Sequence, residues 1–91
     1  HEQAKQWKRE RTRLRKIIEK IEKDQEALRL ELSSWSEKLL EIDSNDFQRS
    51  REVHRQMQNI ENKLVGLEDD WLEASEGVEI LESQLSDLGR Q

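Results

Sequence analysis

Asp43-Ser44-Asn45-Asp46 interrupts two long helical patterns in this 91-residue, proline-free chain. The short polar side chains of Asp, Ser and Asn compete with the backbone for hydrogen bonds, so they favour turns and helix caps over helix interiors. Ser44 or Asp46 could cap a following helix, and Asn45 could occupy a turn. Phe47 comes next and could plug the end of a hairpin. The sequence therefore predicts that one helix ends here and another begins.

On both sides of this interruption, core-type residues recur at alternating spacings of three and four. This is the a/d heptad pattern of a coiled coil, in which each helix carries an apolar stripe that it cannot bury alone. The first run contains Ala4, Trp7, Arg11, Leu14, Ile18, Ile21, Gln25, Leu28, Leu32, Trp35, Leu39 and Ile42. The second run contains Val53, Met57, Ile60, Leu64, Leu67, Trp71, Ala74, Val78, Leu81, Leu85 and Leu88. Arg11 and Gln25 are the polar members, and such residues commonly fix register or partner number.

The two runs do not share one heptad phase, because Ile42 and Val53 are eleven residues apart. We expect an all-α fold, an antiparallel coiled-coil hairpin forming one domain over residues 1–91. Its helices are expected at about 5–42 and 47–88, with a turn at 43–46, in what we take to be a piece of a longer protein. Eleven residues is also one heptad plus a four-residue stutter, so one helix of about 85 residues in a parallel dimer is the alternative.

The distribution of charge favours the hairpin. Residues 1–23 contain nine Lys or Arg and four Glu, whereas residues 61–91 contain nine acids and two bases. A hairpin places these segments side by side, but a parallel dimer would place like charges together, which costs free energy. The hairpin register predicts that Arg15 reaches Glu82 and that Arg29 reaches Glu68.

The composition excludes a globular core of ordinary size. Charged residues make up 41% of the chain and hydrophobic residues 32%, too little apolar material for such a core. Scarce glycine and absent proline also argue against a β-sandwich or a doubly wound α/β fold. The expected core anchors are Trp7, Leu14, Ile18, Ile21, Leu28, Leu32, Trp35, Leu39, Met57, Ile60, Leu64, Leu67, Trp71, Val78, Leu81 and Leu85. The a and d positions of the two runs form the seam of the expected coiled coil. Five apolar residues lie off this seam and could widen the stripe or pair two hairpins: Ile17, Leu40, Val65, Leu72 and Ile80.

No motif in the sequence predicts catalysis. A Gly-rich phosphate loop and a Ser/His/Asp constellation are both missing, so we expect no catalytic residue and no cofactor in this segment. His1 and His54 are far apart without ligands at suitable spacing, so we expect no metal site. Absent cysteine excludes disulfides and is compatible with the cytoplasm. No apolar run is long enough for a membrane span, and we expect no membrane or small-molecule partner.

The basic first segment is the candidate nucleic-acid-binding site. Phosphate binding needs Lys and Arg gathered on one face, and affinity scales with the number of phosphates neutralised. The candidate residues are Lys5, Lys8, Arg9, Arg13, Lys16, Lys20 and Lys23. A solvated or self-paired helix surface is the alternative, and the net charge of −5 argues against strong autonomous binding to bare DNA or RNA.

The basic segment 14–23 (LRKIIEKIEK) is followed by a polar break, a second heptad helix and the segment 67–74 (LEDDWLEA). From about Leu14 to Glu82, the chain resembles the C-terminal coiled-coil domain of ABC-F proteins, which are ATP-binding-cassette proteins without a membrane domain. Arg11, Arg13, Arg15, Lys16 and Lys20 match the family's basic first helix, and Trp71, Leu72 and Glu73 match its closing segment. The resemblance implies ribosome association, a role in translation, ATP hydrolysis elsewhere in the chain, and contact of this extension with rRNA, tRNA or DNA.

Two functions follow as hypotheses. The first is a non-catalytic arm of an ABC-F ATPase that contacts the ribosome or another nucleic acid through its basic first helix. The second is a structural or adaptor coiled coil, a spacer or rod that binds proteins or a second copy of itself and has no nucleic-acid role.

Overall fold

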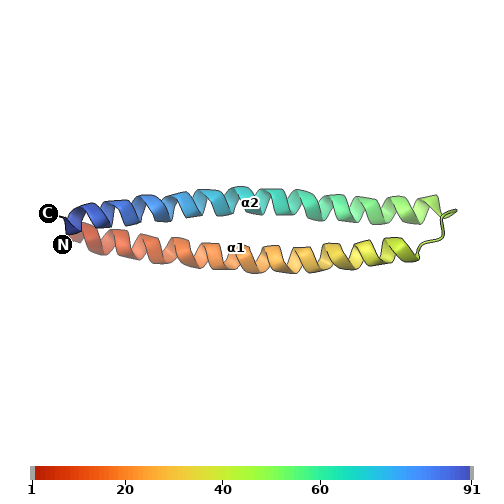
Figure 1. Ribbon diagram of the computed structural model, residues 1–91, viewed down its shortest axis with the longest axis horizontal. Helices are drawn as coiled ribbons and strands as arrows, with labels where there is room; N and C mark the ends of the chain where they lie inside the picture. The colour runs from red at the N-terminus through yellow and green to blue at the C-terminus, as the bar shows by residue number, and fades with distance from the viewer. Residues whose placement is uncertain (1, 91) are drawn as a thin grey trace. The chain divides into compact units, whose positions relative to one another are not determined.

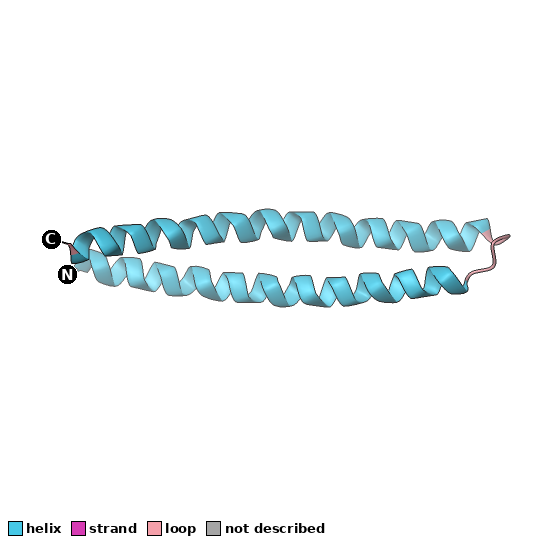
Figure 2. Ribbon diagram, viewed as in Figure 1, coloured by secondary structure: helices cyan, strands magenta, loops and turns pink. Residues whose placement is uncertain are grey.

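The protein consists of two long helices joined by a short connection. The computed structural model describes residues 2–90 and contains α1 (Glu2–Glu41) and α2 (Phe47–Gly89), as Figures 1 and 2 show. No strand occurs within these residues. The predicted fold class, an all-α helical hairpin, is therefore confirmed. The first helix begins earlier than the expected residue 5, at Glu2.

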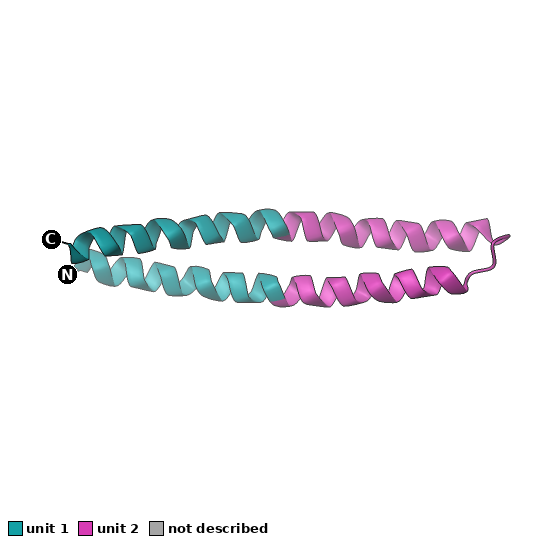
Figure 3. Ribbon diagram, in the orientation of Figure 1, with its two compact units in different colours: residues 1–22, 68–91 teal, residues 23–67 magenta. Residues whose placement is uncertain are grey.

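The chain divides into two compact units, which are coloured separately in Figure 3. The terminal unit comprises residues 1–22 and 68–91, and the turn unit comprises residues 23–67. Within each unit, a segment of α1 lies antiparallel to a segment of α2. Each unit is described by itself below.

Burial follows the two heptad runs. The buried residues all belong to these runs, and they are Ile21, Gln25, Val53, Ile60, Ala74 and Leu81. The remaining members of both runs are half-buried, including the three tryptophans. Each predicted core anchor thus lies at a buried or half-buried position, because two helices can cover only part of each other's stripe.

Gln25 is the one polar residue among the buried positions between residues 2 and 90, and only 6% of it is exposed. Gln25 is not without a partner. Burying an amide among apolar side chains costs free energy unless the amide is hydrogen-bonded. Polar residues buried in a coiled-coil seam commonly fix its register.

The connection is organised by two aspartates. The Asp43 side chain accepts a hydrogen bond from the Asn45 backbone N–H (3.0 Å), and the Asp43 carbonyl accepts one from the Asp46 N–H (2.9 Å). The Asp46 side chain accepts a hydrogen bond from the Arg49 N–H (3.1 Å), which is the geometry of a helix N-cap. Of the two predicted caps, Asp46 is therefore the one that acts.

The expectation that Phe47 plugs the end of the hairpin is wrong. Phe47 is 68% exposed. The heptad explains this, because counting back from Val53 places Ser50 and Asp46 on the seam and leaves Phe47 beside it. Ser50 is accordingly half-buried.

Two glycines lie inside α2 and have different surroundings. A Cβ atom at Gly66 would have no neighbour within 4 Å. A Cβ atom at Gly77 would lie 2.8 Å from Cδ1 of Leu14. Leu14 therefore packs where residue 77 has no side chain, and α1 and α2 of the terminal unit fit closely at this level.

Replacing the cap residue tests the turn. Asp46→Ala removes the acceptor for the Arg49 N–H and should lower the free energy of unfolding by about 1 kcal/mol. Urea unfolding followed by circular dichroism measures this loss. Ser44→Ala is the matched control and should cost much less, since the Asp46 side chain provides the cap. Equal losses in the two variants would contradict the assignment of the cap.

The two glycines give a paired test of helix packing. Gly66→Ala should raise the free energy of unfolding by about 0.5–1 kcal/mol, because alanine is the better helix former and its methyl group would contact no other residue. Gly77→Ala should gain less, since the new methyl group must displace Cδ1 of Leu14. In a Leu14→Ala background the two gains should become equal. Equal gains already in the wild-type background would refute the close contact between Leu14 and Gly77.

Candidate nucleic-acid interface

The seven predicted nucleic-acid-binding residues are all exposed on α1 and all lie off the seam. Lys23 belongs to the turn unit. The other six belong to the terminal unit and are called the cationic face below: Lys5, Lys8, Arg9, Arg13, Lys16 and Lys20.

A line of evenly spaced cations runs through the cationic face. Arg9, Arg13, Lys16 and Lys20 follow one another at spacings of four, three and four, the same alternating spacing as the residues of the seam. Residues with this spacing share one side of a helix. Arg9 and Lys16 lie at the heptad position opposite the seam, and Arg13 and Lys20 lie at the outer position next to it, so the line runs along the outer side of α1. At 1.5 Å per residue it is about 17 Å long.

Some of these cations already have a partner. Arg13 donates through Nε to Oε2 of Glu10 (3.0 Å) and through Nη2 to the other carboxylate oxygen. This hydrogen bond, together with the charge of Arg13, holds the pKa of the Glu10 carboxyl below its usual value, and it raises the pKa of Arg13. Lys20 is also engaged. Lys5, Lys8, Arg9 and Lys16 form no ion pair with any other residue between 2 and 90.

The terminal unit places this cationic segment beside an anionic one. Residues 2–22 of α1 contain eight Lys or Arg and four Glu, and residues 68–90 contain eight acids and one base, Arg90. An ion pair between Arg15 and Glu82 joins the two segments, as the hairpin register predicts. Arg29 and Glu68 belong to different units, so their contact stays a prediction.

Arg11 and Arg15, two of the residues that carry the ABC-F resemblance, do not belong to the cationic face. Arg11 is half-buried in the seam, and its Nε is buried without a hydrogen-bond partner. Arg15 is engaged by Glu82. A ligand approaching the outer side of α1 therefore meets Lys16 and Lys20 but not these two arginines.

The turn unit contains a cation that the sequence reasoning missed. Nζ of Lys38 lies 4.3 Å from the centroid of the Trp35 ring, a distance typical of a cation–π contact. The i,i+3 spacing of the two residues would have indicated this contact. Half-buried in the seam and covered by a lysine, Trp35 offers little ring surface for stacking on a base.

A metal-binding arrangement does not occur in the described part of the chain. No group of three or more His, Cys, Asp or Glu side chains there is close enough to hold an ion. His1 lies outside the described residues. Neither described helix has a stretch that is both long and apolar enough to cross a membrane.

The Arg15–Glu82 ion pair should contribute little to stability. Both side chains are about half exposed, and exposed pairs contribute roughly 0.2–1 kcal/mol. A double-mutant cycle with Arg15→Gln and Glu82→Gln should give a coupling energy in that range, and the coupling should decrease as salt is added. The pair Arg13–Glu10, within one helix, is the reference cycle. A coupling energy that stays constant as salt is added would contradict the description of this ion pair as solvent-exposed.

Comparisons of the chain with protein-family models, with curated proteins and with solved structures find no match. The resemblance to ABC-F proteins therefore depends on the matching residues of this sequence alone.

Proposed function

We propose that this hairpin is a non-catalytic arm that binds the phosphate backbone of RNA through the cationic face of α1. The observation that supports this most is the exposed line of Arg9, Arg13, Lys16 and Lys20, which runs along the outer side of α1 in the terminal unit. The resemblance to ABC-F proteins supports the same function, with ribosomal or transfer RNA in the cytoplasm as the ligand and ATP hydrolysis in another part of a longer protein.

The chemistry of the cationic face suits phosphates better than bases. Lysine and arginine neutralise phosphates and release condensed counterions, which provides affinity without sequence preference. The half-buried tryptophans of the seam leave little aromatic surface for stacking. We therefore expect binding that follows the shape and charge of the RNA and falls steeply with salt.

The acidic segment of α2 sets the orientation of binding. Eight acids between residues 68 and 90 repel a polyanion, so only the α1 side of the terminal unit can approach RNA. The same repulsion weakens the affinity of the isolated hairpin. An arm with this charge distribution is suited to positioning a larger protein that is already bound.

An adaptor that binds proteins is the second candidate function. It is supported by the five apolar residues off the seam, which are all exposed: Ile17, Leu40, Val65, Leu72 and Ile80. A protein partner retained in the absence of any affinity for RNA or DNA would favour this function over the first.

Neutralising the line of cations tests the proposed RNA contact. The variant Arg9→Gln, Arg13→Gln, Lys16→Gln, Lys20→Gln should bind a fluorescein-labelled single-stranded RNA at least tenfold more weakly at about 50 mM salt, since each lost phosphate contact lowers the salt slope by roughly 0.7. Fluorescence anisotropy over a series of salt concentrations gives both quantities. A double-stranded DNA probe in parallel determines which nucleic acid is preferred.

The control variant carries the same change in net charge elsewhere: Arg29→Gln, Arg49→Gln, Arg51→Gln, Lys63→Gln. These four residues are exposed and lie outside the terminal unit. The control should keep most of the affinity for RNA. Equal losses in the two variants would show that only net charge matters, and the absence of salt-dependent binding by the wild type would refute the proposal.

A further inference from the structure

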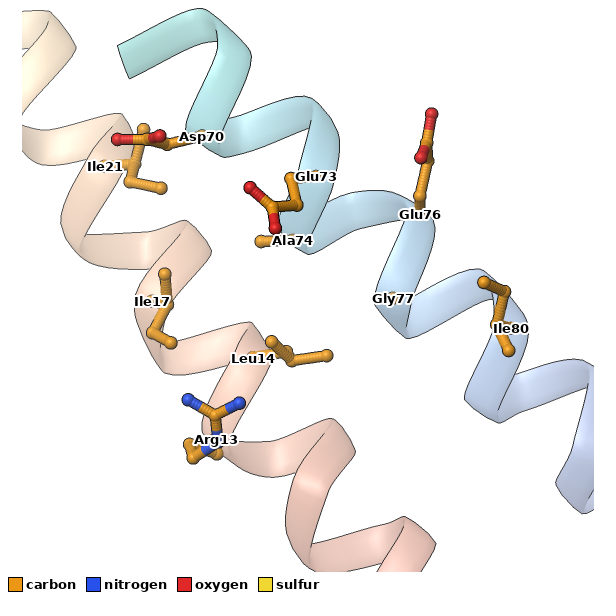
Figure 4. Close-up of a pocket in the computed structure, with 10 residues that line it drawn as sticks. All are labelled: Arg13, Leu14, Ile17, Ile21, Asp70, Glu73, Ala74, Glu76, Gly77 and Ile80. Carbon is orange, nitrogen blue, oxygen red and sulfur yellow. The ribbon is translucent and has the colours of Figure 1, made fainter. Parts of the chain in front are cut away.

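A groove of about 680 Å³ runs along one side of the terminal unit, between α1 and α2 (Figure 4). Its floor is apolar and consists of three residues from each helix, namely Leu14, Ile17, Ile21, Ala74, Gly77 and Ile80. Ile17 is 37% exposed and Ile80 is 59% exposed, so the groove is open to solvent along its length.

Small residues of α2 create the depth of the groove. Residue 77 has no side chain, and residue 74 is a buried alanine. Leu14 points from α1 toward Gly77, as Figure 4 shows, and its Cδ1 occupies the space next to the missing Cβ. A larger residue at position 77 would collide with Leu14, which forms part of the floor of the groove.

The groove distinguishes one flank of the seam from the other. Ile17 and Gly77 both occupy the heptad position that precedes a core position, so the apolar surface extends outward on that flank. The other flank carries the Arg15–Glu82 ion pair. A two-helix seam with one apolar flank has room for a third helix, which would lie in the groove and cover residues that two helices leave exposed.

The charge around the groove selects the occupant. Asp70 and Glu73 extend from α2 toward the α1 side, whereas Glu76 points away (Figure 4). The cation that lines the groove, Arg13, is already held by Glu10. The rim is therefore negative, and a second copy that packed groove to groove would bring the same acids into the interface.

We propose that this groove binds an amphipathic helix of a partner protein, with an apolar stripe edged by lysine or arginine. From Asp70 to Ile80 the groove extends over about 15 Å, which is the length of roughly three helical turns. The inference goes beyond the proposed RNA contact, because only Arg13 belongs both to the line of cations and to the lining of the groove.

The experiment uses the full 91-residue chain and two labelled peptides of about 18 residues, long enough to cover the groove. Both carry leucine at alternating spacings of three and four. One has lysine beside the leucines, and the other has glutamate there. The lysine peptide should bind, as measured by fluorescence anisotropy, and the glutamate peptide should bind at least tenfold more weakly.

Three single substitutions locate the binding site. Ile80→Ser and Glu73→Lys should each weaken binding of the lysine peptide about tenfold, since one removes apolar floor and the other reverses the rim charge. Leu72→Ser is the matched control, because Leu72 is 46% exposed and does not line the groove. It should change the affinity less than twofold. All three positions are exposed, so circular dichroism should show unchanged helicity.

Several outcomes would overturn the inference. These are equal binding of the two peptides, an equal loss in Leu72→Ser, or no binding by the wild type. Self-association in sedimentation that Ile80→Ser abolishes, without peptide binding, would assign the groove to a second copy instead. The variant Arg9→Gln, Lys16→Gln should bind RNA more weakly but bind the lysine peptide with unchanged affinity, which separates this inference from the proposed RNA contact.

Discussion

Neither helix can bury its own apolar stripe, and this constraint underlies the rest of the structure. An isolated helix with a stripe of Leu, Ile and Trp would expose that stripe to water, and its backbone hydrogen bonds alone would give marginal stability. Folding back at Asp43 and Asp46 places a second stripe of similar length within reach. Burial is consequently confined to heptad positions, and even there most residues are only half covered.

The seam occupies only the a and d positions, so the remaining positions are available for interactions with other molecules. In the terminal unit they divide into three surfaces. One flank of the seam carries the Arg15–Glu82 ion pair, the other carries the groove near Gly77, and the outer side of α1 carries the line of cations. The proposed RNA contact and the proposed helix groove thus use different parts of one simple scaffold. The turn unit has no comparable separation of charge in its described residues, and its special features are the buried Gln25 and the Lys38–Trp35 contact.

Much of the fold could be predicted because heptads and caps are local patterns. The phase change between Ile42 and Val53 indicates two helices, the polar tetrad indicates the turn, and the hairpin register gives the Arg15–Glu82 contact. The engagement of Arg13 by Glu10 could also have been found, since an i,i+3 pair is visible in the sequence. The exposure of Phe47 and the groove at Gly77 could not. Both depend on how side chains of one helix meet the surface of the other, and on the absence of a side chain at residue 77. Membership of the ABC-F proteins remains a proposal, because coiled coils share composition and spacing whatever their function.

The position of the turn also determines the order in which the hairpin assembles. Residues 23–67 separate the two segments of the terminal unit, whereas the turn unit closes around residues 42–46. The entropy lost on closing a loop grows with its length, so contacts beside the turn form first and the terminal contacts follow once the intervening residues are ordered. The terminal segments are accordingly the first to separate and the last to join. Because both proposed binding surfaces lie on these segments, any molecule bound there stabilises the paired ends of the helices and slows their fraying.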